Sequence, residues 1–313
     1  MQLSGQRFLV TGGGGFIGRH VVEQLCASGA GVRIADLPGR GESLAERTGA
    51  EFVATDIRRP EQVQQAVDGV DGVFHLAVLA LQPCAEHPRA CLEINVDGAF
   101  NVFDAAQRAG VRKIVFSSAS SVYGDTLEVM DERHPLGART MYGASKIAGE
   151  YLLRAIASTY GLEYVILRYM NVYGPFMGYG LVDSVLKRIA SGQPPVINGD
   201  GSQSFDFVYV TDVAAATVRA MESEVTDEVF NVGSGEEKTV KDVVTTLLEL
   251  AGSPLQPEFR DVQVPMVRRV GSSEKASRLL HWRATVPFRE GMRRVVAEQL
   301  LGARPAPPAM PHG

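Results

Sequence analysis

The chain has 313 residues, a formal net charge of −5 and a sequence pI near 5.8. Apolar residues make up 45% of it and charged residues 21%, which is ordinary for a globular protein. The acidic balance argues against a nucleic-acid-binding protein that relies on a basic surface. No apolar run approaches the roughly 18 residues of a membrane span, and the amino terminus lacks the apolar core of a signal peptide. Three cysteines (Cys26, Cys84 and Cys91) are too few for a disulfide framework, so we expect a cytoplasmic protein.

Short apolar segments alternate with helix-length segments through the first half of the chain. This pattern predicts an α/β fold with a doubly wound parallel sheet. We expect strands at residues 7–11, 32–36, 51–55, 72–76, 113–118 and 163–168. We expect helices between them at residues 16–28, 60–67, 89–109 and 142–160.

Glycine and proline cluster between residues 171 and 207, which predicts loops around one helix at residues 182–191. A strand at residues 229–232 and a helix at residues 240–250 follow. We therefore expect a first domain at residues 1–170, joined by returning segments at about 206–235. Residues 171–302 would mainly form a smaller lobe, and the proline-rich residues 303–313 a disordered tail.

A glycine-rich turn follows the first expected strand and reads Thr11-Gly-Gly-Gly-Gly-Phe-Ile-Gly18. Between a strand and a helix, such a turn indicates a Rossmann dinucleotide site, where the pyrophosphate meets the helix N-terminus. Two glycine registers fit the motif, and the residues concerned are Gly12, Gly13, Gly15, Phe16, Ile17 and Gly18. Asp36 closes the next strand; a carboxylate there favours NAD over NADP because it repels a 2′-phosphate.

Tyr142 and Lys146 lie four residues apart in the expected helix 142–160, so they project from one face about one turn apart. An ammonium beside a phenol favours the ionised phenolate, which makes a base of a weak acid. A carbinol carbon gives up hydride to NAD⁺ only as its hydroxyl loses a proton, so this chemistry needs such a base. Together with the glycine turn, the pair indicates carbon–oxygen redox chemistry.

The order of these motifs resembles the extended short-chain dehydrogenases/reductases of the nucleotide-sugar epimerase/dehydratase family, which includes UDP-galactose 4-epimerase. The resemblance runs from Arg7 to about Leu300, and further matching stretches are Asp56-Ile57, His75-Leu76-Ala77 and residues 95–101, 117–124, 168–175 and 206–212. It implies that Asp56, Ile57, Leu76, Ala77 and Asn95 line an NAD site. It also implies that Tyr142 is the base, that Lys146 holds the nicotinamide ribose, and that helices 89–109 and 142–160 pair in a homodimer.

One residue departs from the family pattern beside the expected base. Members normally carry a Ser or Thr hydroxyl at the position of Ala119. Ser118 and Ser120 flank it and Ser121 lies one residue further, so a neighbour could take the role. We favour Ser120 over Ser118 as the replacement and leave open whether any serine serves. Dehydratases follow this position with Asp-Glu and decarboxylases keep a Glu there, whereas this chain has Ser120 and Ser121. The resemblance therefore favours a C4 epimerase, an isomerase that needs neither acid.

The expected substrate is a nucleotide-diphosphate sugar, most simply a UDP-hexose or UDP-hexuronate. By resemblance, Asn171 would contact the diphosphate or sugar and Val196 would lie beside the base. Related chains usually have arginine where this one has Phe205, so the phosphate contact would fall to Arg260, Arg268 or Arg269. Two alternatives stay open: a 4-ketoreductase that uses NADPH, which Asp36 opposes, and a non-catalytic NAD-binding sensor.

The motif Cys84-x2-His87-x3-Cys91 has a spacing that could hold a metal ion. It offers three ligands without a fourth, whereas zinc sites need four ligands or an open catalytic position. We therefore expect no metal site and interpret these three residues as ordinary loop residues.

Overall fold

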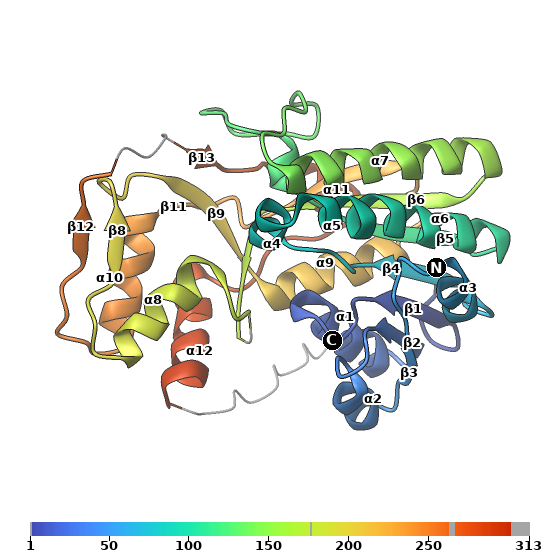
Figure 1. The fold of residues 1–313 in the computed structure, drawn as a ribbon, viewed down its shortest axis with the longest axis horizontal. Coiled ribbons are helices and arrows are strands. Elements are labelled where there is room, and N and C mark those ends of the chain that lie inside the picture. Colours follow the sequence, from blue (N-terminus) through green and yellow to red (C-terminus); the bar gives the residue numbers. More distant parts are fainter. Residues whose placement is uncertain (1, 176, 263–266, 302–313) are drawn as a thin grey trace.

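The computed structural model describes residues 2–175, 177–262 and 267–301. Its centre is a seven-stranded sheet in the order β10-β6-β5-β4-β1-β2-β3, in which every pair is parallel (Figure 1). The strands are β1 (Arg7–Thr11), β2 (Gly31–Asp36), β3 (Glu51–Ala54), β4 (Gly72–His75), β5 (Lys113–Ala119), β6 (Glu163–Tyr169) and β10 (Glu228–Val232). The strand order reverses between β1 and β4, which confirms the expected doubly wound α/β fold.

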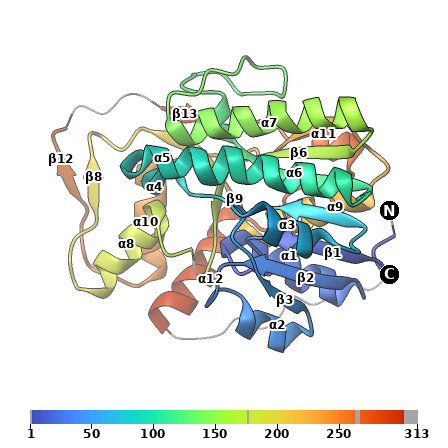
Figure 2. The same cartoon turned by 45° about the vertical axis from the view of Figure 1, so that its right-hand side comes forward.

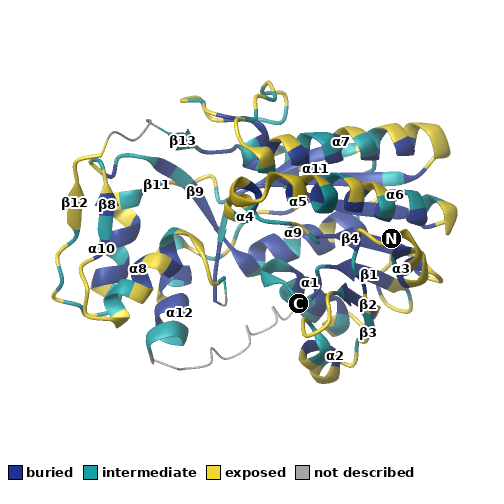
Figure 3. Ribbon diagram, in the orientation of Figure 1, coloured by how far each residue is buried: buried dark blue, intermediate teal, exposed yellow. Residues whose placement is uncertain are grey.

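Helices cover both faces of this sheet, because adjacent residues of each strand point to opposite sides. Val10 and Val115 belong to one buried cluster, and Leu9 and Ile114 belong to another. Figures 2 and 3 show the long helices packed along the sheet, with the central strands buried. The helices of this domain are α1 (Phe16–Ala27), α2 (Glu42–Thr48), α3 (Pro60–Val67), α6 (Gly98–Arg108), α7 (Met141–Tyr160), α9 (Val210–Glu222) and α11 (Glu274–Leu279).

A smaller lobe with its own buried cluster lies at the other end of the molecule (Figure 1). It contains two small sheets, one of β11-β9-β13 with β7 paired to β9, and one of β12-β8. The strands are β7 (Asn171–Tyr173), β8 (Val196–Asn198), β9 (Ser204–Tyr209), β11 (Glu237–Thr239), β12 (Glu258–Arg260) and β13 (Arg268–Arg269). The helices are α8 (Gly180–Ala190), α10 (Val240–Leu250) and α12 (Phe288–Leu301).

The strands of the large sheet begin and end within one residue of their expected positions. The expected helix at residues 89–109 is instead three segments: α5 (Pro88–Leu92), a π-helical turn η1 (Glu93–Asp97) and α6. Helical periodicity in the sequence does not reveal this wider turn, and such π-helical turns concentrate at functional sites. The expected tail at residues 303–313 lies outside the described residues.

The interpretation of Cys84 and Cys91 as ordinary loop residues is wrong, because a disulfide bond joins them. Cys84 lies in the short helix α4 (Leu81–Glu86) and Cys91 in α5, and the chain turns between the two helices at His87-Pro88. The bond removes both thiolates as metal ligands, and Cys26 is left as a free thiol. In the described part of the chain no group of three or more His, Cys, Asp or Glu side chains could hold a metal ion.

None of the helices within residues 2–175, 177–262 and 267–301 is long and apolar enough to cross a membrane.

Candidate active site

The glycine-rich turn leaves no room for side chains where β1 passes into α1. A Cβ on Gly18 would lie 2.1 Å from the carbonyl oxygen of Gly12. A Cβ on Gly12, whose φ is +67°, would lie 2.7 Å from the backbone nitrogen of Ala77. Bare backbone therefore surrounds the N-terminus of α1, which begins at Phe16-Ile17 after Gly15. This cradle fits the pyrophosphate of a dinucleotide, since a helix N-terminus presents unpaired N–H groups to an anion.

Asp36 lies beside this turn at the end of β2. Its carboxylate accepts hydrogen bonds from the backbone nitrogens of Gly14, at 3.1 Å, and Leu37, at 2.8 Å. Partial burial raises the pKa of the Asp36 carboxyl group, although the two backbone donors oppose that shift. The fold thus brings the acid to the edge of the dinucleotide cradle, where a ribose hydroxyl could donate to it.

The other residues expected to line the cofactor site differ in what they contact. Leu76 donates its backbone N–H to the Thr11 carbonyl oxygen, which sets Ala77 against the glycine turn. Ile57 is buried, and the Asp56 carboxylate is held by the Arg58 guanidinium at 2.6 Å.

Asn95 lies in the π-helical turn η1, and its amide is occupied within the protein. Its Oδ1 accepts from the Leu79 backbone nitrogen at 2.7 Å, and its Nδ2 donates to the Leu79 carbonyl oxygen at 3.0 Å. It therefore holds the segment that follows Ala77.

Tyr142 and Lys146 project from the first turns of α7. Thr140 caps this helix by accepting a hydrogen bond from the Gly143 backbone nitrogen at 3.0 Å. The Lys146 ammonium is buried and donates to the Ser117 carbonyl oxygen at 2.6 Å. Its Nζ lies 5.8 Å from the centre of the Tyr142 ring. A strand carbonyl thus fixes the lysine, and the lysine lies beside the phenol, as the four-residue spacing predicts.

The electrostatics of this pair differ from the expectation of a ready phenolate. Burial raises the pKa of Tyr142, with smaller contributions from Tyr179 and Tyr169. Burial also lowers the pKa of Lys146 to about 7, although nearby Glu150 opposes this. Both shifts disfavour the charged forms, so the protein alone holds a neutral phenol. A further positive charge in the cleft is needed to favour the phenolate.

The serines around Ala119 have different surroundings. Ser118 donates its hydroxyl to Glu150 Oε1 at 2.6 Å, and this glutamate is completely buried. Ser120 begins a 3₁₀ turn, η2 (Ser120–Val122), directly after β5. The hydroxyl oxygen of Ser121 is buried and has no hydrogen-bond partner among the described residues. The alternation of side chains along β5 does not predict the burial of the Ser121 hydroxyl, because Ser121 lies beyond the strand, in the 3₁₀ turn.

A cavity of about 300 Å³ opens beside the tyrosine, between the large sheet and the smaller lobe. Its polar lining residues are Ser118, Ser120, Ser121, Tyr142, Asn171 and Arg269, with Tyr169, Tyr173 and Tyr179 also present. Its apolar lining includes Phe16, Ile17, Leu81, Phe205 and Phe207. The cavity therefore joins the expected base, the start of α1 and a single arginine.

The three candidate arginines are placed differently. Arg269 lies in register with Phe205 across the β13–β9 pair and lines the cavity. Its Nε is buried and has no hydrogen-bond partner in the described part of the chain, and its nearest carboxylate, on Asp125, lies 3.8 Å away.

The remaining substrate candidates lie away from this cavity. Arg268 is bound to Glu237 at 2.8 Å, and Arg260 pairs with Glu258 on β12. Val196 lies opposite Glu258 in the β8–β12 sheet. None of these three is among the described residues that line the cavity.

Known proteins are similar to this chain over most of its length. The family model of the NAD dependent epimerase/dehydratase family matches residues 8–233. The chain is 34% identical over 299 residues to a putative UDP-glucose 4-epimerase of Methanocaldococcus jannaschii, covering 92% of this chain and 96% of that protein.

Two solved structures are similar over nearly their whole length. The structure of UDP-glucose 4-epimerase from Thermotoga maritima with UDP-glucose has a TM-score of 0.87 and 33% identity. The match covers 93% of this chain and 97% of the Thermotoga chain. The structure of UDP-glucose 4-epimerase from Thermus thermophilus complexed with NAD has a TM-score of 0.85 and 34% identity. The match covers 94% of this chain and 98% of the Thermus chain.

The glycine contact yields a direct prediction for the cofactor. Gly18→Ala places a Cβ against the Gly12 carbonyl, so we expect NAD binding to weaken at least roughly tenfold, or about 1.4 kcal/mol. NAD released from the purified, denatured protein measures retention. Gly31→Ala is the matched control, since its Cβ meets nothing closer than 3.5 Å. Wild-type NAD content in a folded Gly18→Ala variant would contradict the assignment of the cradle.

Proposed function

The chain belongs to the NAD-dependent epimerase/dehydratase family, and we propose that it catalyses the C4 epimerisation of a nucleotide sugar, a UDP-hexose or UDP-hexuronate. It is an NAD-dependent enzyme of the extended short-chain dehydrogenase/reductase type. The observation that carries the proposal is the pair Tyr142 and Lys146, which lies beside a cavity that reaches the start of α1. Bound NAD supplies the acceptor and donor of hydride at the sugar carbon.

In this proposal Tyr142 takes the proton of the C4 hydroxyl and later returns it. Lys146 cannot swing freely, because its ammonium is tied to the Ser117 carbonyl oxygen at 2.6 Å. It therefore contributes a fixed positive charge beside the phenol whenever it is protonated. The cradle residues Gly12, Gly15 and Gly18 and the Asp36 carboxylate would hold the dinucleotide next to this pair.

The residues after Ala119 support epimerisation over the related eliminations. A dehydratase needs a second acid and base on the sugar, and a decarboxylase relative keeps a glutamate there. Ser120 and Ser121 have no side-chain group that ionises near neutral pH, so they cannot supply that acid–base work. Asp36 opposes the NADPH preference that a 4-ketoreductase would need.

We assign the substrate diphosphate to Arg269. Its guanidinium is partly buried with Nε unpaired, and burial lowers its pKa. An anion in the cavity would compensate a cation held in this way and could accept from its unpaired Nε–H. Because Arg269 faces Phe205 in the sheet register, it could replace the arginine that relatives carry at position 205.

We assign the missing hydroxyl of Ala119 to Ser121 rather than to Ser118 or Ser120. The Ser118 hydroxyl already donates to Glu150, and breaking that bond would leave a buried carboxylate less satisfied. The Ser121 hydroxyl is buried without a partner in the described chain, although Ser121 lines the cavity with Tyr142. Buried polar groups normally have partners, so a substrate oxygen is the natural one.

Further features of the proposal concern organisation. We expect residues 1–170 and 206–235 to bind the cofactor and residues 171–302 mainly to bind the substrate. We expect a cytoplasmic homodimer that pairs α6 and α7, since Phe100 and Tyr151 on these helices are 44% and 58% exposed.

The proposal predicts that purified protein interconverts C4 epimers of a UDP-sugar without added cofactor. Tyr142→Phe should lower turnover by about 10²–10⁴-fold and leave NAD bound, because only the proton acceptor is lost. Chromatography of products from a panel of UDP-, GDP- and dTDP-sugars measures both activity and specificity. Tyr160→Phe is the control on the same helix, with a side chain that is 62% exposed. An active Tyr142→Phe enzyme would rule out the assigned base.

A second prediction separates the serines. Ser121→Ala should lower kcat by about 100-fold with little change in KM, because its hydroxyl would act mainly on the developing alkoxide. Ser120→Ala is the matched neighbour and should retain most of the rate. Steady-state kinetics on the best sugar of the panel measures both. An unimpaired Ser121→Ala enzyme, or an equal loss in Ser120→Ala, would refute the assignment to Ser121.

A further inference from the structure

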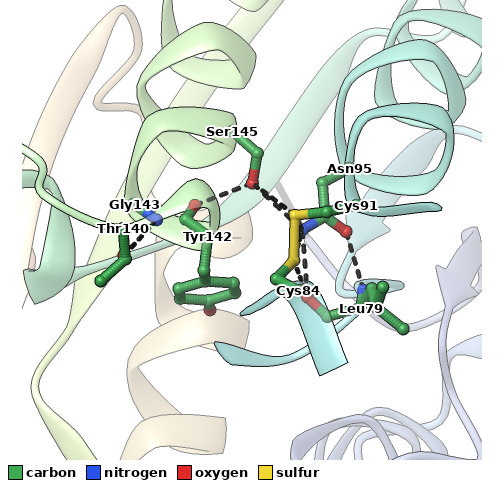
Figure 4. The surroundings of a disulfide bond; sticks show 8 residues. All are labelled: Leu79, Cys84, Cys91, Asn95, Thr140, Tyr142, Gly143 and Ser145. Atoms are coloured by element: carbon green, nitrogen blue, oxygen red, sulfur yellow. Dashed lines mark hydrogen bonds between the residues drawn. A yellow bond between two sulfur atoms is a disulfide. The ribbon is translucent and has the colours of Figure 1, made fainter. Parts of the chain in front are cut away.

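The disulfide between Cys84 and Cys91 lies directly beside Asn95 (Figure 4). The Asn95 amide nitrogen lies 3.4 Å from the sulfur of Cys84 and 3.5 Å from that of Cys91. The same nitrogen lies 3.1 Å from the hydroxyl oxygen of Ser145 on α7. One buried amide thus contacts the cross-link and the helix that carries Tyr142.

Asn95 connects the cross-link to the cofactor cleft through the segment from Leu76 to Leu81. Its amide bonds both the N–H and the carbonyl of Leu79, so it fixes the middle of that segment. At one end of the segment, Ala77 packs against Gly12 so closely that a Cβ on the glycine would clash. At the other end, Ala80 and Leu81 line the cavity beside Tyr142. One wall of the cleft is therefore held by the group that rests on the disulfide.

A second connection runs to the catalytic helix. Ser145 accepts from Asn95 and donates its own hydroxyl to the Tyr142 carbonyl oxygen at 2.7 Å. The backbone of the first turn of α7 is thus coupled to the same amide (Figure 4).

We propose that Cys84–Cys91 is a redox-active site whose oxidation state sets how tightly the enzyme retains its dinucleotide. The reductant is a dithiol: it gives two electrons and two protons, the S–S bond breaks, and the dithiol leaves as its own disulfide. The product is two free thiols, at Cys84 and Cys91. In the cytoplasm that we propose for this enzyme, protein disulfides are usually transient and redox-sensing rather than structural.

Reduction changes the contacts around Asn95 in two ways. Two thiol sulfurs cannot stay at bonding distance, so the Cys84 and Cys91 side chains must separate beneath the Asn95 amide. Each thiol also gains an S–H donor, and Cys84 Sγ already lies 3.3 Å from the Leu79 carbonyl oxygen that Asn95 uses. Both changes weaken the two hydrogen bonds by which Asn95 holds Leu79. We expect the oxidised enzyme to hold NAD more tightly.

Both cysteines are completely buried, so a reductant reaches them only when the chain opens locally. The helices that carry the cysteines favour local opening, because α4 has only six residues and α5 only five. Helices this short depend on packing rather than on their own stability. Reduction should therefore proceed in the folded enzyme on a timescale of local opening.

The test uses the full-length enzyme with its NAD, incubated with dithiothreitol under native conditions. Alkylation and mass spectrometry count the thiols, which should rise from one, on Cys26, to three. Release of the bound NAD on serial dilution, followed by fluorescence, then measures the NAD dissociation constant, which should increase roughly tenfold, the equivalent of about one lost hydrogen bond. Reoxidation should restore the original value.

Two variants make the result specific. Cys26→Ser should respond to dithiothreitol as the wild type does. The double variant Cys84→Ser/Cys91→Ser should show the weaker NAD affinity from the outset and ignore the reductant. Two outcomes would overturn the proposal: a thiol count that stays at one in the folded enzyme, or equal NAD affinity in both redox states, whether or not the melting temperature falls. None of these readouts uses sugar turnover, so they are independent of whether the enzyme is a C4 epimerase.

Discussion

The close contact between α7 and β5 is the constraint on which the rest of the site depends. Gly149 faces the Phe116 ring, and a Cβ there would lie 2.7 Å from that ring. This approach lets the Lys146 ammonium reach the Ser117 carbonyl oxygen at the end of the strand. One turn earlier on the helix, Tyr142 is then directed to the carboxyl edge of the sheet, where open α/β folds bind their ligands.

The packing of α7 against the neighbouring strand β6 also buries charge beneath the site. Arg168 on β6 binds the Glu150 carboxylate of α7 through two of its nitrogens, at 2.9 and 2.7 Å, and both residues are buried. A buried ion pair gives little net stability, but separating its partners would leave an uncompensated buried charge. The pair therefore fixes the position of α7 relative to β6. It also takes the Ser118 hydroxyl, and for this reason we propose that the hydroxyl missing at Ala119 is supplied by Ser121 in the 3₁₀ turn.

The positions of the residues proposed to bind the dinucleotide could be predicted from the sequence, because they depend on local signals, and their binding roles stay predictions. Asp36 and Tyr142 follow from strand ends and helical spacing, which neighbouring residues determine. Arg269 could not be singled out, because the β13–β9 register that sets it opposite Phe205 joins segments more than 60 residues apart. The 3₁₀ turn at Ser121 and the disulfide Cys84–Cys91 were missed because each depends on how the backbone departs from regular periodicity.

The fate of the hydrogen on C4 of the sugar tests most directly whether this enzyme is a C4 epimerase. The enzyme as purified is incubated in ordinary water with a UDP-sugar that carries deuterium at C4, and the epimers are analysed by NMR. For a C4 epimerase we expect the label to stay at C4 in both epimers without added cofactor, because the hydrogen would leave and return as hydride inside one cavity. Loss of deuterium to solvent, or a product that forms only with added NADPH, would contradict it.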